Sequence, residues 1–447
     1  MKVARWPAAF AAAFAAFVTL AAFARTLPAQ QQDTTVRRQQ RMLDSLAAAL
    51  AAIQARLDSA AARPAEPPQA APAQPPSGSY MNIGFVTLVD GGTSTEQDVP
   101  SIELGDHDPV VRGFTMPNSE LSLDGAVDPY FKGFANIVYK IGERGETELE
   151  LEEAYALTTS LPKNLQVKFG QYLTDFGRHN TQHPHAWAFV DLPLVLGQMF
   201  GRDGLRSQGV RLSWLAPTPW YTEAMVTVAN STNETTFSFR ADESFQIHGG
   251  VPVDRPVQSF EDMLVVPRIA TSFDITDTQT LVLGTSAAFG PNNSGFSART
   301  QIYGVDGYWK WKSARASQGF PFVSLQGEAL SRRYVAEQRL AIDDPAVTLP
   351  ADTIWDSGSY LQGLWGIRPR IVAGLRGDWV RPATEAAFVS PQRLDRFRLS
   401  PNFTWYPTEF SKLRLQYNYD NRSIFGTDHS LWVQFEFLLG AHAAHKF

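Results

Sequence analysis

The segment Leu431-Trp432-Val433-Gln434-Phe435-Glu436-Phe437-Leu438-Leu439, near the C-terminus, decides the fold class. Its odd-numbered positions are all bulky and apolar, whereas Gln434 and Glu436 occupy even-numbered positions. A period of two residues is typical of a β-strand with one face toward an apolar phase and the other toward water. The chain ends on Phe447, which has the parity of the apolar face. We interpret this segment as the closing strand of a β-barrel that faces lipid; the alternative is an ordinary amphipathic strand that ends in Phe.

Composition narrows the class of protein further. The 447 residues are 44% apolar, 12% aromatic and 19% charged, with a mean hydropathy of -0.20. Beyond the N-terminus no run of about 18 apolar residues occurs, which excludes a bundle of membrane helices but not a barrel, whose strands are only half apolar. The absence of cysteine excludes disulfides and thiolate metal sites. The net charge of -6 argues against nucleic acid as a partner.

The first 79 residues differ in texture from the rest of the chain. Residues 1–29 have the basic start, apolar run and small-residue cleavage site of a secretory signal, with a retained membrane anchor as the alternative. Residues 30–62 contain heptads, which predict a coiled-coil helix; an Ala-rich single helix or spacer is the alternative. Residues 63–79 are rich in Pro and Ala and predict an extended linker. Residues 80–447 form the predicted barrel.

Alternating segments separated by turn residues recur along this predicted barrel. We predict an all-β fold, a 16-stranded antiparallel transmembrane β-barrel preceded by a short periplasmic helix. The predicted strands are 81–88, 111–123, 127–140, 146–157, 163–173, 206–216, 219–230, 262–275, 278–290, 298–312, 319–333, 357–368, 371–381, 393–406, 411–420 and 429–440.

The connections between these strands alternate in length. Those after even-numbered strands are short, whereas 89–110, 174–205, 231–261 and 334–356, which follow odd-numbered strands, are long. Long loops at one end and short turns at the other are typical of outer-membrane barrels, in which the long loops are extracellular. An even strand number places both termini at the periplasmic, short-turn end.

Aromatic residues gather at both ends of the predicted outward face. Those near short turns are Trp214, Trp220, Phe273, Trp309, Trp311 and Trp405, and those near long loops are Tyr139, Phe289, Trp379, Tyr417 and Tyr419. Leucines such as Leu375 and Leu413 lie between the two groups. Two aromatic girdles around an aliphatic band match the two interfaces of a membrane, so outer-membrane lipid is the expected surrounding.

The predicted inward face is polar and carries charge of both signs. Its basic residues are Arg368, Arg370, Arg376, Arg396, Arg398, Lys412 and Arg414, and its acidic residues are Glu120, Asp124, Glu148, Glu150 and Glu152. Because alternate residues of a strand are about 7 Å apart, these residues predict a basic wall opposite an acidic one. Ladders of like charge set ion preference in pores; the alternative is that Arg and Glu pair across the lumen.

The connection 174–205, called loop three below, is the second candidate for function. Its polar residues Asp175, Arg178, His179, His183, His185 and Asp191 precede an apolar run from Leu192 to Phe200. A long apolar loop is expected to fold into the lumen and narrow it. His179, His183 and His185 could together hold a metal such as zinc, although histidines also form hydrogen bonds within packed loops. His442 and His445 form a second, weaker candidate for metal binding.

Several motifs carry a resemblance to a known family. They are 127–131 (VDPYF), 152–155 (EEAY), 168–172 (KFGQY), 176–180 (FGRHN), 183–187 (HPHAW), Gly204-Leu205, Gly209-Val210 and the ending 440–447 (GAHAAHKF). With these motifs the chain resembles the phosphate-selective porin (O and P type) group, and more closely bacterial proteins labelled zinc-regulated TonB-dependent outer-membrane receptor-like. The resemblance implies a trimer with an inward third loop, an arginine-rich lumen and a periplasmic coiled coil. It also implies that the barrel-assembly machinery reads Phe447.

These observations predict a passive outer-membrane channel of a diderm bacterium for small hydrophilic, anionic solutes, without cofactor or catalysis. A receptor for a metal or metallophore, using the histidines of loop three, is the main alternative. An outer-membrane enzyme is a further alternative, but the sequence contains no Ser/His/Asp grouping at a strand end that would support it. A purely structural or adhesive barrel is the remaining possibility.

Overall fold

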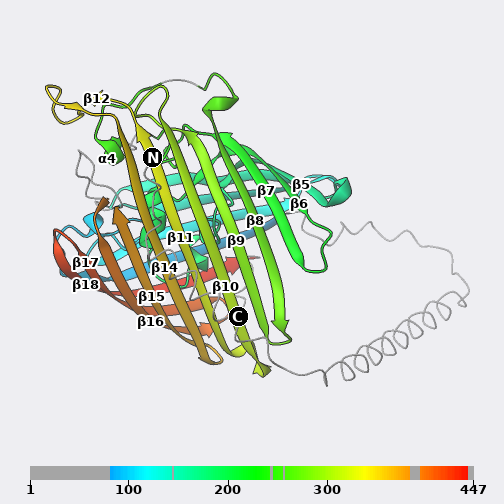
Figure 1. Ribbon diagram of the computed structural model, residues 1–447. Coiled ribbons are helices and arrows are strands. Elements are labelled where there is room, and N and C mark those ends of the chain that lie inside the picture. Colours follow the sequence, from blue (N-terminus) through cyan, green and yellow to red (C-terminus); the bar gives the residue numbers. More distant parts are fainter. Residues whose placement is uncertain (1–80, 143–144, 242–244, 255–256, 383–392, 441–447) are drawn as a thin grey trace, which may run out of the picture. The chain divides into compact units, whose positions relative to one another are not determined.

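A closed antiparallel β-barrel of sixteen strands is the dominant feature of the computed structural model (Figure 1). The structure describes residues 81–142, 145–241, 245–254, 257–382 and 393–440. The predicted signal, coiled coil and linker, together with Phe447, His442 and His445, therefore lie outside the described residues. Antiparallel pairing of the first strand with the last, from Gly84 with Gly440 to Ser94 with Ser430, closes the barrel.

Each of the sixteen predicted strands overlaps one barrel strand, which confirms the predicted fold class. The barrel strands are β1 (Met81–Ser94), β2 (Gly113–Ala126), β3 (Phe131–Ile141), β4 (Thr147–Thr158), β5 (Leu165–Leu173), β6 (Arg206–Leu215), β7 (Tyr221–Asn230), β8 (Met263–Thr276), β9 (Gln279–Pro291), β10 (Arg299–Ser317), β11 (Phe320–Ala336), β14 (Asp352–Arg368), β15 (Ile371–Pro382), β16 (Arg396–Thr408), β17 (Ser411–Arg422) and β18 (Gly426–Gly440). A separate hairpin of β12 (Arg339–Leu340) and β13 (Thr348–Leu349) lies between β11 and β14.

The two ends of the barrel differ as the sequence predicted. Turns such as Asp277-Thr278 and Pro369-Arg370 join strands at the end that we call the short-turn end. Loop one (95–112), loop three (174–205) and loop four (231–262) lie at the opposite, long-loop end. Loop three contains the helix α3 (Leu194–Phe200), and loop four contains α4 (Phe245–His248). None of the described helices has the length and apolar character needed to cross a membrane.

Strand β18 shows how the two-residue period is used. Leu431, Val433 and Phe435 are exposed, whereas Gln434 and Glu436 are buried inside the barrel. The same alternation continues on β17, where Leu413 and Leu415 face outward. The outward face is thus apolar and the inward face of these strands mostly polar, as the sequence indicated, with the buried Trp432 as an apolar exception.

The interior is less polar than the sequence analysis predicted. A buried apolar cluster joins α3 to inward-facing residues of β8, β10 and β11, among them Leu264, Ile302 and Leu330. Since the apolar side chains of α3 need apolar partners, these strands place apolar side chains inward where the helix packs. The prediction of a uniformly polar inward face is therefore wrong for this sector of the barrel.

Candidate functional site: the charged lumen and loop three

Five basic side chains of β15, β16 and β17 form one group on the inner wall, which we call the arginine wall: Arg376, Arg396, Arg398, Lys412 and Arg414. Strand pairing places Arg376 and Arg398 near each other, because Arg376 pairs with Ser400 and Asp378 pairs with Arg398. Both arginine residues are 0% exposed. Burying a cation without a partner costs free energy. Each of these side chains is therefore expected to have an anionic or polar partner.

Asp191 of loop three supplies much of that neutralisation. Its carboxylate accepts hydrogen bonds from Arg376 Nη2 at 2.9 Å and from Gln416 Nε2 at 2.7 Å, and it pairs with Arg398 Nη1 at 2.5 Å. Asn418 Nδ2 donates a further hydrogen bond at 3.1 Å. Burial acts to raise the pKa of the Asp191 carboxyl, but Arg376 and Arg398 outweigh it and hold this pKa below its ordinary value. Asp191 is therefore a buried anion bound by three strands.

The backbone of loop three is also bound along the arginine wall. Arg376 Nη1 donates to the carbonyl of Asp191 at 2.8 Å, Arg414 Nη2 to that of Trp187 at 2.7 Å and Lys412 Nζ to that of His185 at 2.8 Å. Charge-assisted hydrogen bonds of this kind are about twice as strong as neutral ones. Residues 185–191 thus lie on the inner surface of the barrel, held by cations that were predicted to line the pore as a basic wall.

Loop one adds a second source of negative charge to the same wall. Glu103 Oε2 lies 2.7 Å from Arg398 Nη1, and Asp420 of β17 accepts hydrogen bonds from Arg396 Nε at 2.8 Å and Arg398 Nε at 2.7 Å. Loop one also contacts loop three directly, since Asp108 Oδ1 accepts the backbone N–H of Leu192 at 2.7 Å. The arginine wall is therefore covered by two loops.

Two of the predicted pore-lining cations are placed differently. Arg368 and Arg370 are exposed at the short turn between β14 and β15, where Arg370 has a positive φ of 72° and donates to the carbonyl of Pro407. The ladder is irregular between Gly366 and Arg368, so strand register does not place these two side chains with the arginine wall. Their place in the pore lining stays a prediction.

Residues 183–185 of loop three are bound to the acidic wall through histidines. His183 Nδ1 lies 2.8 Å from Glu152 Oε2, His183 Nε2 lies 2.9 Å from Glu153 Oε2, and His185 Nδ1 lies 2.9 Å from Glu120 Oε2. Burial acts to lower the pKa of His183, but Glu152 and Glu120 outweigh it and raise this pKa well above its ordinary value. Loop three therefore presents a cation to the acidic wall and an anion to the arginine wall.

His179 lies apart from this histidine pair. Its ring packs against those of Trp187 and Tyr360, and burial, assisted by Arg376, lowers the pKa of His179 to about 3. The structure does not bring His179, His183 and His185 together as one ligand set. Among the described residues, the group whose ligand atoms lie within 4.8 Å of one another is instead Asp106, His107 and Asp203.

The remaining loop-three residues also contact the wall. Asp175 pairs with Arg211 of β6 at 2.9 Å. Arg178 donates to Gln326 of β11 at 3.2 Å and lies over the ring of Tyr308 at 4.2 Å. These contacts reach strands that the arginine wall and the acidic wall do not include, so loop three is held on several sides of the lumen.

The predicted acidic residues divide into three places. Glu120 and Glu152 bind the histidines, whereas Glu150 pairs with Arg206 and Glu148 lies 3.1 Å from Lys140 near the long-loop end. Asp124 is exposed and accepts a hydrogen bond from Asn82 at 3.2 Å. Two of the five therefore contact loop three directly.

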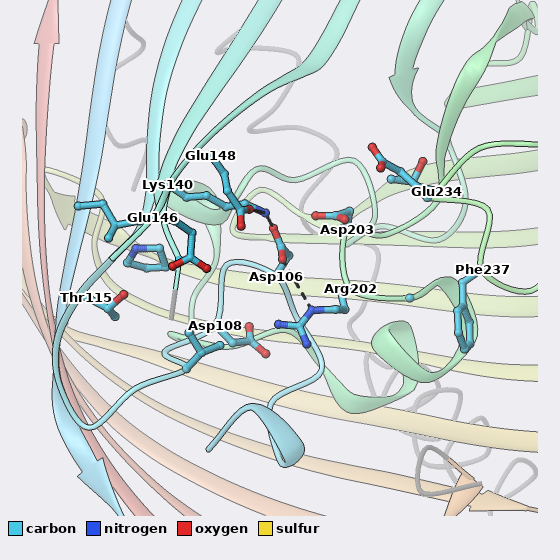
Figure 2. A pocket seen from close by; sticks show the side chains of 16 residues that line it. Asp106, Asp108, Thr115, Lys140, Glu146, Glu148, Arg202, Asp203, Glu234 and Phe237 are labelled. Atoms are coloured by element: carbon cyan, nitrogen blue, oxygen red, sulfur yellow. Dashed lines mark hydrogen bonds and ion pairs between the residues drawn. The ribbon is translucent and has the colours of Figure 1, made fainter. Parts of the chain in front are cut away.

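Beside Glu148 the long-loop end contains an open cavity of about 570 Å³ (Figure 2). It is lined by loop one, the start of β2, the β3–β4 hairpin, the end of loop three and loop four. Six carboxylates and two cations line it: Asp106, Asp108, Glu146, Glu148, Asp203, Glu234, Lys140 and Arg202. We call it the acidic cavity. Sequence analysis did not single it out, because its residues come from four separate connections.

Comparison with known proteins identifies a relative in sequence. No family model matches the chain. It is 33% identical over 356 residues to an uncharacterized protein of Aquifex aeolicus (strain VF5), an alignment that covers 75% of this chain and 70% of that protein. The chain belongs to the same family as this Aquifex protein.

Solved structures of outer-membrane channels share the fold of this chain. The anion-selective porin from Comamonas acidovorans matches with a TM-score of 0.51 at 8% identity, covering 80% of this chain and 99% of that one. The outer membrane channel DcaP of Acinetobacter baumannii matches with a TM-score of 0.50 at 13% identity, covering 80% and 97%. These likenesses show the porin fold; membership of the phosphate-selective group stays a prediction.

Proposed function

We propose that the chain is an outer-membrane channel through which small hydrophilic solutes diffuse passively, and that loop three sets its width. The closed barrel with its apolar outward face and the porin fold support a channel. The observation that carries the narrowing is the position of residues 185–191 on the arginine wall, where Arg376, Arg398, Lys412 and Arg414 bind them. The proposal assigns no chemical step to the chain.

The proposed preference for anionic solutes applies to a form of the channel in which loop three has moved away from the arginine wall. In the structure described here Asp191, Glu103 and Asp420 neutralise Arg376, Arg396 and Arg398. A paired guanidinium offers little attraction to a passing anion, whereas an unpaired one matches carboxylate and phosphate groups. We therefore propose that the wall attracts anions after loop three has moved away from it.

The fold and the sequence also support a proposal for the setting of the channel. We propose an outer membrane as its location, with the long loops outside and the N-terminal helix in the periplasm. We also propose a homotrimer and recognition of Phe447 by the barrel-assembly machinery, on the basis of the family resemblance. Crosslinking of the purified protein followed by gel electrophoresis tests the trimer.

Conductance of the purified full-length protein in a planar bilayer tests the proposed function. The wild-type protein should give small, stepwise conductance. Asp191→Ala should give larger steps, because loop three loses its anion on the wall, whereas Asp277→Ala in an exposed turn should match the wild type. Absence of conductance from both the wild-type protein and Asp191→Ala would contradict the channel, and unchanged step size in Asp191→Ala would contradict the role of loop three.

A further inference from the structure

The acidic cavity differs from the rest of the charged interior, because several of its carboxylates face open space. Asp106 contacts Lys140 and lies 3.7 Å from Arg202 Nε, and Glu148 lies 3.1 Å from Lys140 Nζ (Figure 2). These two cations face six carboxylates. The lining therefore has an excess of negative charge, which favours a positively charged ligand.

Three residues of this region have the composition of a metal site. Asp106, His107 and Asp203 each offer one ligand atom, and these atoms lie within 4.8 Å of one another. Asp106 and His107 belong to loop one, whereas Asp203 belongs to the end of loop three. Two carboxylates and one imidazole are ligands that suit Mn²⁺ and Zn²⁺.

The hydrogen bonding of His107 leaves one ring nitrogen available. His107 is 5% exposed, and its Nδ1 lies 3.0 Å from the carbonyl oxygen of Pro117. Because a carbonyl only accepts, Nδ1 is the donor of this hydrogen bond. Nε2 lies 3.9 Å from Glu152 Oε1, which is within ion-pair range but beyond hydrogen-bond distance. A histidine whose other nitrogen donates to a backbone carbonyl is the usual arrangement of a metal ligand.

Asp203 has a carboxylate oxygen without a hydrogen-bond partner among the described residues. This oxygen, Oδ1, is buried. A buried carboxylate oxygen without a partner costs free energy. A bound cation would remove that cost, and this observation is independent of the histidine.

We propose that Asp106 and Asp203 at the acidic cavity, together with the buried His107 beside them, bind a divalent metal cation such as Mn²⁺ or Zn²⁺. Lys140 competes with the ion for Asp106, and binding transfers Lys140 entirely to Glu148. Because the ligands come from loops one and three, the ion connects the two loops that cover the arginine wall. The site does not depend on conduction, so it can fail while the proposed channel stands.

Titration of the purified full-length protein with MnCl₂, with free Mn²⁺ measured by electron paramagnetic resonance, tests the site. The wild-type protein should bind one Mn²⁺ per chain at this site. Asp203→Asn and His107→Gln should each weaken binding at least about tenfold, as loss of metal-site groups does. Lys140→Gln should strengthen binding, because it removes the competing ammonium.

Glu234→Gln is the matched control, since it removes one negative charge from the same cavity without removing a proposed ligand. It should change affinity much less than Asp203→Asn. Equal weakening by the two variants would overturn the ligand assignment in favour of diffuse attraction, and absence of Mn²⁺ binding would overturn the site. Circular dichroism establishes that each variant keeps its β-structure, and Lys140→Gln tests the site without removing a ligand.

Discussion

The arginine wall and the acidic cavity both concentrate charge inside one barrel, but they use it differently. On the arginine wall Arg376 and Arg398 are fully buried and bound by Asp191, Glu103 and Asp420. In the acidic cavity six carboxylates and two cations line an open space, and Lys140 contacts Asp106 and Glu148. Buried, paired charges position loop three, whereas charges beside open space are available to a ligand.

Replacement of a paired arginine should have the largest effect. Arg398→Met leaves three buried carboxylates, those of Glu103, Asp191 and Asp420, without this partner. Breaking a buried ion pair typically costs about 3–5 kcal/mol, and we expect a loss of this size in the free energy of unfolding, measured with urea. Arg368→Met, at an exposed arginine, is the matched control and should change stability by less than about 0.5 kcal/mol. Equal effects would remove the distinction between the two regions.

Truncation of the apolar part of loop three should have the next largest effect. Phe200 is 0% exposed and its ring lies 5.0 Å from that of Phe176, centroid to centroid. Phe200→Ala should cost about 3 kcal/mol, the lower range for a buried Phe. Hydrogen exchange at the amides of α3 checks this, because faster exchange there reports release of the helix. Unchanged exchange would show that charge alone holds loop three.

The binding of His183 in loop three to Glu152 and Glu153 should weaken as pH rises. The pKa of His183 is raised in the folded protein, so its contribution is fully present below the ordinary histidine value of about 6.5 and is lost as pH rises through the raised value. Hydrogen bonds to charged groups contribute about 1.5–3 kcal/mol. Hydrogen exchange of residues 183–187, corrected for the intrinsic dependence on pH, should therefore lose protection at alkaline pH. His183→Gln should remove this dependence, and a wild-type loop that loosens on acidification to pH 5 instead would contradict the assignment.

Neutralising a carboxylate of the acidic cavity should have the smallest effect on stability. The Glu148 side chain is 48% exposed, so Glu148→Gln should change the free energy of unfolding by less than about 0.5 kcal/mol. It should nevertheless shift the reversal potential in the direction of anion preference, because it removes negative charge from the long-loop end of the channel. A large loss of stability with no change in reversal potential would assign this region a structural role.

The barrel could be predicted because its pattern is local. The alternation from Leu431 to Leu439 gives the direction of each side chain, and the same parity on β16 and β17 gives the inward direction of Arg398 and Arg414. Turn residues then limit each strand. None of these inferences requires knowledge of residues that are distant in sequence.

The state of the charges could not be predicted from such patterns. Asp191 and Arg398 are separated by 207 residues, and Glu103 and Arg398 by 295. The sequence showed loop three as apolar and long, but not which wall would bind each of its charged residues. The acidic cavity combines four connections, so its lining has no contiguous motif. The proposed ligands His107 and Asp203 lie far apart in the sequence, at a spacing that matches no known metal-binding motif.

The reversal potential of the wild-type channel in a salt gradient tests the central claim most directly. If the arginine wall holds loop three and the acidic cavity faces the solute, the wild-type channel should not prefer anions, and Asp191→Ala should shift the potential toward anions. A strongly anion-selective wild-type channel, with a potential that Asp191→Ala leaves unchanged, would show that the arginines act on the solute rather than on the loop.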